Sequence, residues 1–311
     1  MIAPNVKKRS FFLLAFDGSE HARAAVSFLY DLIVQQGVKT KSSLVLLAVF
    51  TPRQIGDLTP LQQALEQTHI FYKEKGVRSK TELILGYPSE KIIEYANELK
   101  PALIAIGAKG LRAAFGIMLG GVAQNVVEHA CCPVLVVRAP YKGFRHILLV
   151  ADGSPHSLRA VEYLTRLRLS PITQLSMMHV LPPIPIKPVP DFITHTWPSS
   201  PEVMPPFSQE LSSEELAMLR EEEKGGQAIL DQAVQLFQEK GSRVQIRQVL
   251  LRGDAASEII QYAKDQGIDL IVSGARGESA IRSWLLGSVS RKLVHYAHCS
   301  VLIVKESAAS N

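Results

Sequence analysis

The stretch SGARGESAIRSWLLGSVSRKLVHYAHCSVLIV, from Ser273 to Val304, decides the fold of this chain. It begins in apolar residues typical of a strand, crosses a loop with three glycines, and ends in a helix and a second apolar run. Because glycine has no Cβ, we expect Gly274 and Gly277 to take positive φ angles and to let the backbone approach a ligand. A helix that begins after Gly287 presents unpaired N–H groups and about half a positive charge, which suits an anion. The stretch therefore predicts a loop that binds phosphate.

Two alternatives to this interpretation concern the same loop. The chain has neither the Gly-Lys-Ser/Thr of a Walker A loop nor the Gly-x-Gly-x-x-Gly of a dinucleotide fold. In the alternative without a ligand, the glycines merely shape a tight turn, and Ser288 caps the helix. The Asp-Gly-Ser at 152–154 favours the ligand, because Asp152 offers an acceptor for ribose hydroxyls or a ligand for Mg²⁺.

The chain is an internal repeat. FFLLAFDGSEHARAAVSFL (11–29) matches HILLVADGSPHSLRAVEYL (146–164), and in both an apolar strand leads through Asp-Gly-Ser into a helix. The spacing between matching residues is 135 at Asp17 and Asp152 but 167 at Gly107 and Gly274. The second half therefore carries an insertion, which we place at 181–211.

We expect two α/β domains, 1–140 and 141–311, each built on a doubly wound parallel sheet. The strands in LIAIG and DLIVSG are continuously apolar, as in a sheet covered on both faces. Proline is too frequent in the insertion at 181–211 for a helix or a central strand. We expect this insertion to be a lid or a segment that docks a partner, unless it is a plain surface excursion.

The element boundaries of the second half can be predicted from its periodicity and its turn residues. We expect strands at 146–151, 173–180, 243–250, 269–273 and 300–304, and helices at 155–168, 213–239, 255–266 and 288–298. Ser212 and Glu215 form the pattern of a capping box at the start of the long helix. The apolar runs at 133–138 and 300–304 would each end a sheet, and two such edges can pair with each other.

Composition restricts the class of protein. A length of 311 residues suits two domains, and 47% apolar with 20% charged residues describes a globular chain. The net charge of +5 is spread without a basic run, so we expect no nucleic-acid partner. The three cysteines have neither a disulfide pattern nor a metal-site spacing. With no signal peptide and no apolar run of roughly 18 residues, we expect a cytoplasmic protein and no membrane partner.

These residues resemble the universal stress proteins in their tandem form. Nucleotide-binding members of that family carry Gly-x2-Gly-x9-Gly-Ser/Thr before the last helix, and Gly274, Gly277, Gly287 and Ser288 match this motif without a gap. The resemblance covers nearly the whole chain except the insertion. It implies five strands in the order 3-2-1-4-5 in each half, with the last strands paired across a pseudo-two-fold axis as in the family's dimer. A homodimer of whole chains is left open.

The resemblance also implies ATP, with Mg²⁺, in the crevice of the second half. Its implied contacts lie on the first, second and fourth strands, on the glycine loop and at the start of the last helix. Those to adenine and ribose are Val150, Ala151 and Asp152, with Val180 reaching adenine through its backbone. Those around ribose and phosphates are Ser273, Gly274, Arg276 and Gly277, and the phosphate cradle is Gly287, Ser288, Val289 and Ser290.

The first half keeps only part of this pattern. Its loop reads GAKGLRAAFGIMLGGVAQ (107–124), with Gly121 where the second half has Ser288 and Ala123 where it has Ser290. Both hydroxyl donors are lost, although Lys109 offers a cation. We therefore expect a weaker nucleotide site there. Its residues are Asp17, Gly107, Gly110 and Gly120.

The sequence thus predicts an ATP-binding stress-response or regulatory protein with an unidentified protein partner. No residue stands out as a general base, so slow ATP turnover, and with it enzyme status, is left open. An enzyme of the adenine-nucleotide α-hydrolase type would need a Ser-Gly-Gly-x-Asp-Ser loop or a His-x-Gly-His motif, which the chain lacks. A scaffold without ligand is the third hypothesis, and the complete motif of the second half argues against it.

Overall fold

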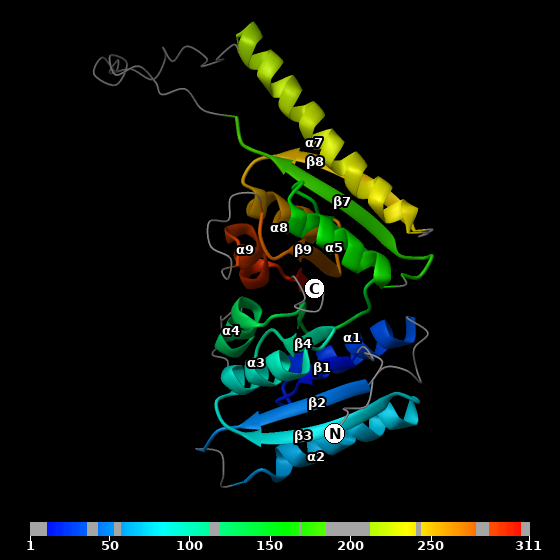
Figure 1. Cartoon of the computed structure of the whole chain (residues 1–311), viewed down its shortest axis with the longest axis vertical. Helices are drawn as coiled ribbons and strands as arrows, with labels where there is room; N and C mark the ends of the chain where they lie inside the picture. The colour runs from blue at the N-terminus through cyan, green and yellow to red at the C-terminus, as the bar shows by residue number, and fades with distance from the viewer. Residues whose placement is uncertain are drawn as a thin grey trace, which may run out of the picture.

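Ten strands form one sheet in the computed structural model, and helices cover both of its faces (Figure 1). The strand order is β3-β2-β1-β4-β5-β10-β9-β6-β7-β8. The structure describes residues 11–35, 43–52, 57–111, 119–167, 169–184, 212–240, 244–277 and 286–305.

Each half is a doubly wound unit with parallel strands in the order 3-2-1-4-5, as predicted. The elements of the first half are β1 Phe11–Ala15, α1 Glu20–Gln35, β2 Ser43–Phe50, α2 Thr59–Glu74, β3 Arg78–Leu85, α3 Pro88–Leu99, β4 Leu103–Gly107, α4 Gly121–His129 and β5 Val134–Val137. Those of the second half are β6 His146–Val150, α5 Pro155–Arg166, β7 Gln174–Leu181, α7 Ser213–Glu239, β8 Gln245–Arg252, α8 Ala255–Asp265, β9 Leu270–Gly274, α9 Ser288–Tyr296 and β10 Ser300–Val304. The elements expected in the second half agree with these to within two residues at each end.

The start of α7 confirms the predicted capping box. Ser212 Oγ accepts a hydrogen bond from the Glu215 amide at 3.1 Å, and the Glu215 carboxylate accepts one from the Ser212 amide at 2.8 Å. The insertion expected at 181–211 begins later than predicted, because β7 continues to Leu181. Residues 185–211 lie outside the described residues, and the expected role of the insertion lies there with them.

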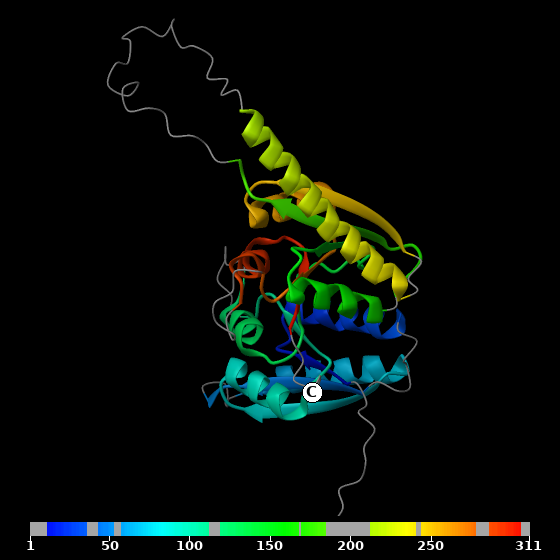
Figure 2. The ribbon, with the colours of Figure 1, turned by 45° about the horizontal axis from the view of Figure 1, so that its top comes forward.

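Two apolar layers lie on opposite faces of the sheet, and each runs through both halves of the chain. Helices α1, α2, α5 and α7 cover one face, and α3, α4, α8 and α9 cover the other (Figures 1 and 2). The ring of Phe28 in α1 also stacks on the ring of Phe144 in the linker between the halves, with 4.8 Å between the ring centroids. The halves therefore share their cores.

The halves join where β5 pairs antiparallel with β10. The register sets Val301 opposite Val136, Leu302 opposite Leu135 and Ile303 opposite Val134, and the residues of this pairing are buried. This confirms the prediction that the two apolar edge strands pair with each other. Each strand thereby satisfies backbone groups that an isolated half would expose.

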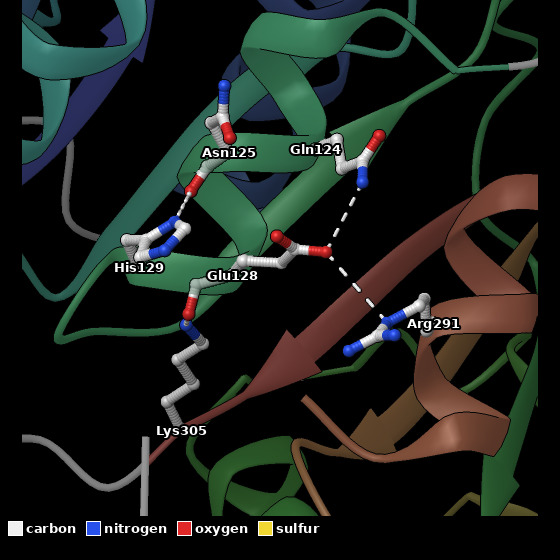
Figure 3. Close-up of polar contacts among 6 residues, drawn as sticks. All are labelled: Gln124, Asn125, Glu128, His129, Arg291 and Lys305. Carbon is white, nitrogen blue, oxygen red and sulfur yellow. Dashed lines mark hydrogen bonds and ion pairs between the residues drawn. The ribbon is translucent and has the colours of Figure 1, made fainter. Parts of the chain in front are cut away.

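Each half also caps a helix of the other half with a basic side chain. Arg138, just after β5, donates from Nη2 to the Val294 and His295 carbonyls of α9 at 2.8 and 3.1 Å. Lys305, just after β10, donates from Nζ to the carbonyls of Glu128 and Ala130 at 3.0 and 2.8 Å, at the end of α4 (Figure 3). Carbonyls at the end of a helix have no partner within it and carry partial negative charge, so a cation there is favourable.

Burial has a cost at both caps. It lowers the pKa of the Arg138 guanidinium, and it lowers the pKa of Lys305 to about 8. The neighbouring thiols of Cys132 and Cys131 act in the opposite direction on Lys305. The two caps occupy equivalent positions in the repeat, so each half caps the last helix of the other half in the same way.

Helices α4 and α9 also contact each other directly (Figure 3). The Glu128 carboxylate accepts a hydrogen bond from Gln124 Nε2 at 3.3 Å and lies 3.8 Å from Arg291 Nε of α9. These are the helices that begin at the two glycine loops, so the loops belong to one connected unit.

Replacing Arg138 with Met removes both donors and leaves the carbonyls at the end of α9 buried without this cap. We expect the free energy of unfolding to fall by about 2–4 kcal/mol, because hydrogen bonds from charged groups are lost inside the protein. Thermal denaturation followed by circular dichroism measures the effect. The matched control is Arg78→Met on the exposed edge strand β3, which should change stability little. Equal loss in both variants would contradict the capping role of Arg138.

Candidate functional site

The Asp-Gly-Ser turn after the first strand folds in the same way in both halves. In the second half, Asp152 Oδ1 accepts from the Ser154 amide at 3.0 Å, and Gly153 takes φ +81°. Ser154 Oγ then caps α5 by accepting from the Ser157 amide at 3.2 Å. The positive φ explains the glycine, and the two side-chain bonds explain the aspartate and the serine.

The first half repeats each of these contacts. Asp17 Oδ1 accepts from the Ser19 amide at 3.0 Å, and Ser19 Oγ accepts from the Ala22 amide at 3.1 Å. Gly18 takes φ +78°. The repeated tripeptide is therefore a structural turn in both halves, whatever it binds in addition.

The serine of this turn also holds the glycine loop. Ser154 Oγ donates to the Arg276 carbonyl at 3.4 Å, and Ser19 Oγ donates to the Lys109 carbonyl at 3.1 Å. Strands β6 and β9 are neighbours, as are β1 and β4, so the loop after the first strand and the loop after the fourth lie together. The sequence did not indicate this serine as a tie, because its partner lies 122 residues away in the second half.

The loop glycines are needed for close contacts. A Cβ on Gly274 would lie 2.6 Å from the backbone carbonyl of His156, at the start of α5. A Cβ on Gly277 would lie 2.5 Å from Asp152 Oδ2. Neither glycine has a positive φ, so the expectation of left-handed turns at these positions is wrong. Both positions require glycine because the space between the loop, α5 and Asp152 is too small for a Cβ.

The start of α9 does not match the alternative in which Ser288 caps the helix. Gly287 is the N-cap residue, its amide donates to the Ala275 carbonyl at 2.9 Å, and Ser288 is the first helical residue with an exposed side chain. The helix start has no side-chain cap. Its first N–H groups and the Ser288 hydroxyl thus lie where an anion would be favoured.

The other two serines of the site serve the loop itself. Ser290 is only 4% exposed, and its Oγ donates to the Gly274 carbonyl at 2.8 Å. Ser273 is buried as well and donates to the same carbonyl at 3.1 Å. The Ser290 hydroxyl holds α9 against the end of β9, whereas the Ser273 hydroxyl bonds within β9 itself. This differs from the expectation that Ser290 offers its hydroxyl to a ligand.

The predicted adenine-side residues lie at the ends of adjacent strands. Val150 and Val180 are partly exposed at the ends of β6 and β7, and the buried Ala151 donates its amide to the Met178 carbonyl at 2.9 Å. His179 lies here as well, and its Nδ1 donates to the Ala151 carbonyl at 2.8 Å. The structure brings these residues near Asp152 and the described part of the loop, while residues 278–285 lie outside the described residues.

A cavity of about 470 Å³ lies at the matching position in the first half. Asp17, Gly107, Gly110 and Gly120 all line it, so the residues of the predicted weaker site do lie together. Gly121, in the place of Ser288, is exposed at the start of α4.

No group of three or more His, Cys, Asp or Glu side chains within the described ranges could hold a metal ion. No helix in the described part of the chain has both the length and the apolar character needed to cross a membrane.

Two doubly wound α/β units, each with a glycine loop between its fourth strand and last helix, define a class of tandem α/β proteins. The model of the universal stress protein family matches residues 12–138 and again residues 143–305. The chain therefore belongs to the universal stress protein family, in tandem form.

Individual relatives agree with this assignment. Universal stress protein YxiE of Bacillus subtilis is 32% identical over 162 residues, which cover 52% of this chain and 99% of that protein. Universal stress protein Rv2005c of Mycobacterium tuberculosis is 25% identical over 233 residues, covering 73% of this chain and 69% of the relative. A crystal structure of a universal stress protein from Archaeoglobus fulgidus has the same fold, with a TM-score of 0.59, 18% identity, and coverage of 96% of this chain and 99% of that one.

Replacing Gly274 with Ala tests the packing of the glycine loop. The new methyl group would overlap backbone atoms of α5, so we expect a loss of about 1–3 kcal/mol in the free energy of unfolding. The matched control is Gly225→Ala in α7, where a Cβ meets no atom within 4 Å. That change should stabilise the helix by up to about 1 kcal/mol. Thermal melts of both variants give the answer, and a Gly274→Ala protein as stable as wild type would refute the close approach.

Proposed function

We propose that this protein is an ATP-binding regulatory protein of the stress response, acting in the cytoplasm, and that it holds the nucleotide in its second half. The observation that carries the proposal is the complete Gly-x2-Gly-x9-Gly-Ser series, with the exposed Ser288 at the uncapped start of α9. The tie between Ser154 and the Arg276 carbonyl supports it, because it keeps Asp152 beside that loop.

Each residue then has a role that follows from its chemistry. The N–H groups of Ser288 and Val289 and the Ser288 hydroxyl bind phosphate oxygens, where the helix dipole favours negative charge. Asp152 accepts hydrogen bonds from ribose hydroxyls. The apolar side chains of Val150 and Val180 pack against adenine.

The residues present also fit a magnesium ion that enters with ATP. Mg²⁺ usually keeps several waters and takes one or two carboxylates together with the substrate's phosphates, so a single Asp152 is enough. Bound ATP would supply those phosphate ligands. The proposal is binding and regulation, and it does not include ATP hydrolysis.

Calorimetric titration of the full chain with ATP and Mg²⁺ tests the site. We expect one tight site per chain. Ser288→Ala should weaken binding about ten- to a hundredfold, because a hydrogen bond to a charged group contributes roughly 1.5–3 kcal/mol. Asp152→Ala should weaken binding as well.

The repeat provides the matched control. Asp17→Ala removes the same carboxylate from the same turn in the first half, and it should leave the tight site unchanged. Two tight sites, or a single site lost with Asp17→Ala but kept with Asp152→Ala, would contradict the assignment. Absence of binding at millimolar ATP would favour the ligand-free scaffold, and steady release of product would favour the enzyme of the α-hydrolase type.

A further inference from the structure

We propose that the cavity of the first half is a second binding site with a different ligand, an apolar monocarboxylate. The cavity lies at the ends of β1, β2 and β4, and α2, α3 and the described residues 107–111 and 119–123 also line it. Its volume of about 470 Å³ is in the usual range for sites of small organic molecules, which is roughly 300–1,000 Å³. This proposal is independent of nucleotide binding in the second half.

The described lining of the cavity is mostly apolar. Its apolar residues on β2, α2, α3, β4 and just before α4 include Leu47, Val49, Leu61, Ile92, Ile106 and Leu119. The described lining has three polar side chains, Asp17, Thr51 and Lys109. An apolar guest gains by leaving water here, whereas a triphosphate would lose hydration without enough new partners.

The first half also departs from its own repeat in ways that disfavour a nucleotide. Phe16 lines the cavity at the position of Ala151, so an aromatic ring stands where the second half has a methyl group. Gly121 and Ala123 replace Ser288 and Ser290, and Ala123 is buried against the cavity. The loss of the exposed Ser288 hydroxyl makes the site less polar, and the ring of Phe16 adds apolar surface.

Lys109 is the one basic residue among the described residues that line this apolar site. Lys109 lines the cavity and is partly exposed. The pKa of the nearby His21 is lowered chiefly by burial and also by the positive charges of Lys109 and Arg138, so the surroundings already disfavour a second cation. The uncapped start of α4 lies on the same side of the cavity. A single acidic group on an apolar body is the ligand chemistry that matches this arrangement.

Asp17 brings a carboxylate to the same site, and Lys109 and the start of α4 offset its negative charge. Its Oδ1 accepts from the Ser19 amide at 3.0 Å and its Oδ2 from the Leu111 amide at 3.2 Å, so both oxygens are used in holding the loops. The carboxylate is therefore part of the wall, and Lys109 remains the charged group suited to an anion.

Decanoate is a suitable probe, with decanol as its uncharged analogue, in calorimetric titrations of the full chain. We expect one saturable decanoate site per chain that ATP does not displace. Lys109→Gln should weaken decanoate binding about five- to tenfold and leave decanol binding nearly unchanged, because only the acid loses a charge partner. Decanoate that fails to bind, or that ATP displaces, overturns the proposal. An equal effect of Lys109→Gln on both probes overturns the assignment of the acid group.

A pair of matched variants separates the two sites. Val49 and Val180 occupy equivalent positions, since Leu47 pairs with Ala15 and Met178 with Val150 in the same register. Val49→Trp should fill the first cavity and abolish decanoate binding while ATP binding persists. Val180→Trp should weaken ATP binding and leave decanoate binding intact. Thermal melts verify folding, and Val49→Met serves if the larger ring prevents it. Loss of ATP binding with Val49→Trp in a folded protein would place the nucleotide in the first half and contradict the proposal.

Discussion

The antiparallel pairing of β5 with β10 is the constraint on which the rest of the structure depends. Without it, each half would end in an open apolar edge, and the two core layers would stop at the domain boundary. With it, the sheet continues through ten strands. Arg138 and Lys305 reinforce the pairing because each extends one of the two strands and caps a helix of the opposite half.

This pairing explains how the two halves can differ in their sites while they stay alike in fold. The reciprocal caps end α4 and α9, and the Glu128–Arg291 contact joins these helices, which begin at the two glycine loops. The loops are therefore held by contacts that do not involve any ligand. A first half fixed in this way can lack the exposed hydroxyl that Ser288 provides in the second half, and it can carry Phe16 and an apolar cavity, without loss of the interface.

Much of the fold follows from local signals in the sequence. The repeat of Asp-Gly-Ser, the capping pair Ser212 and Glu215, and the two apolar edge runs predicted the elements and the joining of the halves. The strand order came from the family resemblance. The part that could not be predicted depends on contacts between distant residues, such as the tie from Ser154 to the Arg276 carbonyl.

The loop glycines also show that contacts between distant residues cannot be predicted from local sequence. Their spacing indicated a special loop, but spacing cannot distinguish a positive φ from a close approach, and Gly274 is required by the backbone of α5. If the two halves bind different ligands, the protein holds one nucleotide, in its second half. Native mass spectrometry of the purified full chain with ATP and Mg²⁺ distinguishes this from the alternatives. We expect a single adenine-nucleotide adduct per chain. Two adducts of equal strength per chain, or none, would contradict it.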